Sequence, residues 1–226
     1  MIAVAQARPS ERAEFIKKTY MHLAGAVGAF IVVEYIFFAL GIAEMLGQFV
    51  IGSSFGWLAM LGGFMLLGSL ASNFASKAGD VNAQYTGLGI YVLGEAVMFA
   101  PLLWIADRAA PGAISAAAVV TLFLFAGLTA IVFTTGQDFS FLGGALKIFG
   151  LIALGLIVCS FIFQGLSLGI WFSVAMVAFA GASILYQTSQ VMKRYPADYY
   201  VAASLALFSS VMLLFWYVLR IFMSRR

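Results

Sequence analysis

Residues 113–135 read AISAAAVVTLFLFAGLTAIVFTT, which is 23 residues without a charged side chain. A helix needs about 20 apolar residues to cross the hydrocarbon core of a bilayer. Within hydrocarbon every backbone amide must find a partner inside the protein, so only helices and closed barrels can span it. Barrel strands alternate polar and apolar side chains, and the stretch from Val119 to Val132 does not. We therefore predict a membrane-spanning helix at 113–135, opened by Pro111 and Gly112.

Six further apolar runs flank this segment, joined by short links that hold the helix breakers and many of the charged residues. The runs cover residues 20–41, 55–75, 85–106, 141–163, 168–186 and 199–223. The predicted fold class is an all-α integral membrane protein with seven transmembrane helices. We expect one transmembrane domain over residues 20–226, preceded by a cytoplasmic N-terminal tail over residues 1–19.

Composition excludes several classes of protein. Of the 226 residues 64% are hydrophobic and 9% are charged, whereas a soluble domain is about 45–50% apolar and about 25% charged. The net charge of +3 is too small and too scattered to bind a phosphate backbone. We therefore expect the lipid bilayer as the surroundings of the chain and no nucleic-acid partner.

Chemistry-bearing residues are scarce. The single cysteine and the single histidine, Cys159 and His22, cannot assemble a zinc site. Ser209 and Ser210 have no evident base partner in the sequence. We predict that the chain is not an enzyme and that it has no catalytic residues, cofactor or metal site.

Lys and Arg in the short loops predict the orientation, because they concentrate on the cytoplasmic side. With the N-terminus inside, seven of these residues lie in cytoplasmic segments and one lies in an outer loop. We expect a cytoplasmic N-terminus and a periplasmic C-terminus, although Arg225 and Arg226 then lie on the outer side against the rule.

Two acids lie inside apolar runs, Glu34 near the middle of the first and Glu95 near the middle of the third. An ionisable side chain at such depth costs about 2.5–3.5 kcal/mol on insertion scales, which makes it a candidate functional residue. One interpretation is a proton-titrating or cation-binding pair. The alternative is that each is a protonated glutamic acid that hydrogen-bonds to a neighbouring helix.

A polar stripe marks the last two runs. It includes Ser183 in the sixth run, Gln187 directly after that run, and Ser209 and Ser210 in the seventh run. Small and hydroxylated residues allow helices to approach closely and to hydrogen-bond across the contact. Helix packing and a polar path through the membrane are both consistent with the stripe. The pair Gly87 and Gly89 in the third run also favours close helix packing.

Four stretches carry a further signal. They are FIKKTYMHLA at 15–24, TTGQDFSFLGG at 134–144, ILYQTS at 184–189 and YVLRI at 217–221. Together they resemble the Bax inhibitor-1 family, and the resemblance extends over nearly the whole chain. The sixth-run stretch ends in Thr-Ser, which makes it most similar to the bacterial YccA-like branch. Asp138 and Arg220 each lie in one of these stretches.

The resemblance implies a last helix surrounded by the other six, and it implies two kinds of activity. In the YccA-like branch the activity is to bind and restrain the membrane AAA protease FtsH. In other members it is a pH-sensitive calcium leak that uses an acid pair between the sixth and seventh helices. Here the matching positions are Gln187 and Ser210, or its neighbour Ser209. We therefore predict a modulator of FtsH in a bacterial inner membrane. The alternative is a calcium or cation leak channel, which the neutral Gln187 and Ser210 disfavour.

Overall fold

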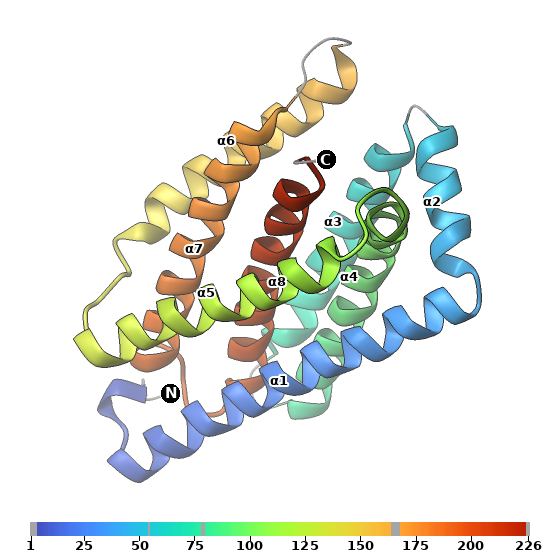
Figure 1. Cartoon of the computed structure of the whole chain (residues 1–226). Helices are drawn as coiled ribbons and strands as arrows, with labels where there is room; N and C mark the ends of the chain where they lie inside the picture. Colours follow the sequence, from blue (N-terminus) through green and yellow to red (C-terminus); the bar gives the residue numbers. More distant parts are fainter. Residues whose placement is uncertain (1–3, 54, 78–79, 164–167, 225–226) are drawn as a thin grey trace.

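A computed structural model describes residues 4–53, 55–77, 80–163 and 168–224, and every regular element within these ranges is helical. Seven of the helices are long and apolar enough to cross a membrane. The predicted all-α membrane fold with seven transmembrane helices is thus confirmed. The elements are η1 (Val4–Gln6), α1 (Pro9–Ala39), α2 (Ile42–Gly52), α3 (Gly56–Ala75), α4 (Val81–Ala109), α5 (Ala113–Thr135), α6 (Leu142–Ile162), α7 (Ile170–Lys193) and α8 (Tyr200–Ser224) (Figure 1).

Helix α2 differs from the sequence prediction, in which residues 42–54 form a link between two spans. It follows a turn at Gly41, whose φ of 74° is in the left-handed region that favours glycine. With 11 residues, α2 is about 17 Å long at 1.5 Å per residue, which is too short to cross a bilayer. It packs against α4, where a Cβ on Gly47 would lie only 2.4 Å from the Trp104 ring.

Helices α1 and α7 extend furthest beyond their apolar runs. Helix α1 begins at Pro9, so residues 9–19 continue into the first span without a break. Helix α7 continues to Lys193, seven residues past the predicted end of its run. Its last turns contain Thr188 and Ser189, which are both buried. The polar side chains that ended the apolar run therefore belong to a packed helix.

Helices α4 and α8 are the two most buried of the seven long helices. Helix α8 packs against α1, α3, α4, α5 and α7. Figure 1 shows α8 running through the middle of the bundle, with α6 and α7 on one side and α2, α3 and α4 on the other. The complete ring of six helices around the seventh stays a prediction.

Aromatic contacts reveal the direction of α4 relative to α8. Tyr91 lies beside Phe208, with 6.2 Å between ring centroids, and two turns further along both helices Phe99 lies 5.0 Å from Trp216. The two helices therefore run parallel. This is the direction expected for the third and seventh of seven alternating spans.

Helices α3 and α4 meet at a close contact at Gly87. A Cβ there would lie 2.6 Å from the carbonyl oxygen of Ala71 and 2.8 Å from the backbone nitrogen of Ala75. A Cβ on Gly89 would meet no atom within 4 Å. The prediction of close helix packing is thus confirmed for Gly87 and wrong for Gly89.

Candidate functional site

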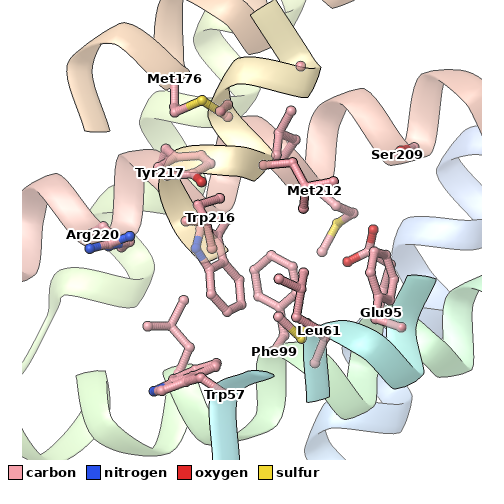
Figure 2. A pocket seen from close by; sticks show the side chains of 18 of the residues that line it. Trp57, Leu61, Glu95, Phe99, Met176, Ser209, Met212, Trp216, Tyr217 and Arg220 are labelled. Atoms are coloured by element: carbon pink, nitrogen blue, oxygen red, sulfur yellow. The ribbon is translucent and has the colours of Figure 1, made fainter. Parts of the chain in front are cut away.

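A cavity of about 610 Å³ lies beside α8, with α3, α4, α6 and α7 contributing its other walls (Figure 2). Most of its lining side chains are aliphatic or aromatic. Its hydroxyl-bearing and charged lining residues are Tyr91, Glu95, Ser160, Ser209, Tyr217 and Arg220. Three of the residues predicted from sequence, Glu95, Ser209 and Arg220, therefore line one cavity.

Glu95 is at the midpoint of α4 and is only 6% exposed. Of the four salt bridges found among the described residues, none involves Glu95. One turn earlier on α4, the Tyr91 hydroxyl donates a hydrogen bond of 2.8 Å to Ser209 Oγ of α8. This bond places two hydroxyl groups and one carboxyl group in the same part of the cavity.

Aromatic rings form the next layer of the cavity. The Trp216 ring lies edge-on to Trp57, with 5.6 Å between centroids, and edge-on to Phe99 at 5.0 Å. Beyond this layer, the Arg220 guanidinium lies 5.9 Å from the centroid of Tyr217. Figure 2 shows Glu95 and Arg220 at opposite ends of the group of lining side chains.

Glu34 is also buried, at 6% exposure, but it is not one of the residues that line this cavity. Both of its carboxyl oxygens lack a hydrogen-bond partner among the described residues. It lies five residues before the end of α1, because that helix begins at Pro9 and ends at Ala39. Its position within the apolar run is as expected from sequence, but Glu34 and Glu95 do not share the cavity.

The contact between α7 and α8 joins two hydroxyl groups. Ser210 Oγ donates to the Ala206 carbonyl at 3.1 Å and lies 2.8 Å from Ser183 Oγ. Met176 of α7 belongs to the same small packed cluster as Tyr217 of α8. Met176 lies seven residues before Ser183 on α7, and Tyr217 lies seven residues after Ser210 on α8. The contacts therefore move backward along one helix as they move forward along the other, so the two helices run antiparallel.

This register separates two residues that the resemblance would pair. Gln187 is one turn beyond Ser183 on α7, which places it level with Ala206 rather than with Ser210. Gln187 is half-buried and lies outside the cavity lining. The partner of Ser210 is therefore Ser183, which the sequence identifies only as a member of the polar stripe.

Asp138 lies in the link between α5 and α6 and fastens that link to α7. Its Oδ1 accepts hydrogen bonds from the Ser140 backbone at 2.9 Å and from Ser189 Oγ at 3.3 Å. The Phe139 backbone donates to the same Ser189 hydroxyl at 3.0 Å. Arg194 adds an ion pair to Asp138 Oδ2 at 3.8 Å and a hydrogen bond to Ser140 Oγ at 2.9 Å.

These partners stabilise the ionised form of Asp138. The hydrogen bond from the Ser140 backbone is the largest cause of a lowered pKa at this carboxyl group, and the Ser140 side chain adds to it. The arrangement resembles an Asx turn, in which an aspartate caps the backbone two residues further on. Asp138 is thus a residue that holds a loop, and it does not face the cavity.

No cluster of three or more His, Cys, Asp or Glu side chains that could hold a metal ion occurs within the ranges that the structure describes. The carboxyl group in the cavity, Glu95, is accompanied by hydroxyl groups and aromatic rings. Such a site can hydrogen-bond to a ligand or attract a cation.

Seven long apolar helices, with a cavity between five of them, define a polytopic α-helical membrane protein. The chain belongs to the Bax inhibitor-1 family, since the sequence model of that family, described as "Inhibitor of apoptosis-promoting Bax1", matches residues 12–226. The family resemblance seen in the sequence is thereby confirmed.

Two relatives match part of the chain. The uncharacterized protein PA2604 of Pseudomonas aeruginosa is 37% identical over 109 residues, which are 48% of this chain and 49% of that protein. A "BI1-like protein" of Arabidopsis thaliana is 36% identical over 113 residues, which are 46% of this chain and 43% of that protein. The chain spans about half the length of the curated relatives it matches.

Proposed function

We propose that this member of the Bax inhibitor-1 family binds and modulates a membrane AAA protease of the FtsH type, without catalytic chemistry of its own. The observation that carries the proposal is the neutral contact between Ser183 and Ser210. A calcium leak of the kind that the resemblance implies needs an acid pair between these two helices. Because this pair is absent, we favour the other activity that the resemblance implies, which is to bind and restrain FtsH.

The cytoplasmic end of α1 is the surface that we assign to the protease. Arg12 and Lys17 lie in the first turns of α1, and Lys17 is exposed. The Val4 backbone N–H donates a hydrogen bond of 2.9 Å to the Tyr195 carbonyl in the link between α7 and α8, which places η1 beside that link. Four Lys or Arg residues before the first apolar run favour the cytoplasm for this end.

Capture of FtsH from native bacterial membranes tests this assignment. The full-length protein is expected to retain the protease, and the double variant Arg12→Glu and Lys17→Glu is expected to lose most of it. The control is Asp107→Lys, which changes a charge near the C-terminal end of α4. Because α4 runs away from the start of α1, this change is expected to leave the proposed protease surface intact. Absence of FtsH from the captured material, or equal capture by both variants, would contradict the assignment.

A bacterial inner membrane with the N-terminus inside is part of the same proposal. Its supports are the Lys and Arg distribution and the bacterial relative. Reporter fusions that are active only in the cytoplasm or only in the periplasm, placed after Gly136 and after Gly112, test it. Residues Arg225 and Arg226 lie outside the described ranges.

The second candidate is a calcium or cation leak, and Glu95 is the observation that favours it. Its carboxyl group lies at the middle of a membrane helix and faces the cavity. Calcium flux into proteoliposomes, measured between about pH 6 and pH 8, tests this candidate. Flux that Glu95→Gln abolishes would support the leak, and the absence of flux at every pH would remove it.

A further inference from the structure

We propose that the cavity beside α8 is a binding site for a lipophilic organic cation, such as a hydrophobic amine that partitions into the bilayer. The first observation in favour of a cation is the charge of the site. Glu95 is the acidic residue of the lining, it is 94% buried, and no cationic side chain pairs with it within the described ranges. Burying a carboxylate without a partner costs free energy, and a bound cation would provide that partner.

The second observation in favour of a cation is the layer of aromatic rings near Glu95. Trp57, Phe99 and Trp216 form an edge-on cluster one turn beyond Glu95 along α4. The face of an aromatic ring attracts a cation within about 6 Å, and tryptophan does so most strongly. A carboxyl group next to such rings is the chemistry that recognises an organic ammonium group.

Arg220 is too distant to neutralise Glu95. The parallel pairs Tyr91 with Ser209 and Phe99 with Trp216 place Glu95 level with Met212 on α8. Arg220 lies eight residues beyond Met212, which is about 12 Å along the helix at 1.5 Å per residue. The acidic and basic ends of the cavity are therefore separate, and a ligand at Glu95 meets the acidic end.

The composition of the lining favours an organic cation over a metal ion. Calcium takes six to eight oxygen ligands, typically about 2.3–2.6 Å away. Near Glu95 the lining offers that carboxyl group together with the hydroxyls of Tyr91 and Ser209, which already bond to each other. The surrounding walls are apolar, so the ligand must carry apolar surface of its own.

Entry from the bilayer fits the position of α6. Helix α6 is the least buried of the seven long helices and packs mainly against α7. It supplies one wall of the cavity through residues that include Gly150, Ala153 and Ile157. A ligand dissolved in the membrane therefore approaches the cavity past a peripheral helix.

Two probes of nearly equal shape and opposite charge test the proposal. Tetraphenylphosphonium and tetraphenylborate are titrated against the purified full-length protein in lipid nanodiscs, and binding is followed by calorimetry. Tryptophan fluorescence is recorded as a second readout, because Trp57 and Trp216 line the cavity. We expect saturable binding of the cation and binding of the anion that is weaker by roughly tenfold or more, since the charge pair and the rings both select a cation.

Three variants distinguish binding in the cavity from uptake of the probe by the lipid. Glu95→Gln is expected to weaken cation binding by roughly tenfold or more, because it removes the charge and keeps the shape. Glu34→Gln, which changes a buried acid outside the cavity, is expected to leave binding unchanged. Gly150→Leu is expected to obstruct the cavity, and the Cβ that it adds would lie 3.5 Å from Phe179, an ordinary contact.

The proposal is overturned if cation and anion bind equally, if the cation shows no saturable binding, or if Glu34→Gln weakens binding as much as Glu95→Gln. Size-exclusion profiles and melting curves establish that each variant is folded. If Glu95→Gln does not fold, the decision rests on Gly150→Leu, where undiminished cation binding overturns the proposal. None of these readouts depends on a protease or on ion flux, so the result is independent of the proposed function.

Discussion

The hydroxyl oxygens of Ser183 and Ser210 lie 2.8 Å apart, and they join α7 to α8 where the family resemblance led us to expect Gln187 opposite Ser210. The link is neutral and short. It can be made and kept at any pH at which the protein is folded. The consequence is a helix contact that does not respond to protons.

A double-mutant cycle on Ser183→Ala and Ser210→Ala measures this contact. Hydrogen bonds between membrane helices contribute about 0.6 kcal/mol on average and up to about 1.7 kcal/mol. We expect a coupling energy in this range that is the same at acidic and neutral pH. Unfolding in mixed micelles provides the measurement, and Gln187→Ala with Ser210→Ala serves as the control pair. A larger coupling between Gln187 and Ser210 would contradict the observed register.

Tyr91→Phe tests the link between α4 and α8 at the edge of the cavity. The variant removes the hydroxyl that donates to Ser209 and leaves the ring in place. A typical hydrogen bond contributes about 0.5–1.5 kcal/mol, so we expect a loss of stability of about 1 kcal/mol. Tyr91→Phe combined with Ser209→Ala should cost little more than either change alone. Fully additive losses would show that the two hydroxyls do not interact.

Gly87→Ala and Gly89→Ala form a matched pair on one helix. The added Cβ at Gly87 would press on the backbone of α3, whereas the Cβ at Gly89 would meet no atom within 4 Å. Overpacking costs about 1–3 kcal/mol, and alanine is preferred to glycine in a helix by about 0.8–1.0 kcal/mol. We expect a lower melting temperature for Gly87→Ala and an unchanged or higher one for Gly89→Ala. Equal shifts would contradict the α3–α4 contact.

Asp138→Asn tests the loop clasp through its dependence on pH. Because the folded state lowers the pKa of Asp138, ionised Asp138 adds stability above its unfolded value of about 3.9, and this contribution is lost as the pH falls through the folded pKa. We therefore expect the wild type to be more stable than the variant at neutral pH. The difference should shrink between about pH 4 and pH 2, below the unfolded value. Melting curves over this range measure it.

Asp198→Asn in the link between α7 and α8 is the control for this titration, because it changes an exposed aspartate close in sequence to Arg194. The wild type and this control should melt in parallel across the range. A difference between the wild type and Asp138→Asn that stays constant down to pH 2 would contradict the clasp.

The sequence predicts the long helices well because each must satisfy its own backbone inside the membrane. Helix α5 begins and ends at the predicted residues, Ala113 and Thr135. Helix α2 escaped notice because an apolar segment of 11 residues gives no signal for a span. The apolar run predicts too early an end for α7, because hydropathy does not distinguish buried polar residues such as Thr188 from those of a link.

The candidate site was predictable only in part. The depth of Glu95 in its apolar run identified it as a functional candidate, and the structure places it in a cavity. Its aromatic neighbours Trp57 and Trp216 are far apart in the chain, so no local pattern brings them together. The partner of Ser210 depends on the register of two antiparallel helices, which is determined by packing and not by residue type.

Co-reconstitution with FtsH is the most direct test of the central claim that this chain modulates a membrane protease. Purified FtsH is placed in liposomes with the full-length protein or with the double variant Arg12→Glu and Lys17→Glu, and degradation of a membrane-protein substrate is timed. The account predicts slower degradation with the full-length protein and an unaltered rate with the variant. The account would be contradicted if the full-length protein left the rate of substrate degradation by FtsH unchanged. This holds at protein ratios where both proteins are present in the same liposomes.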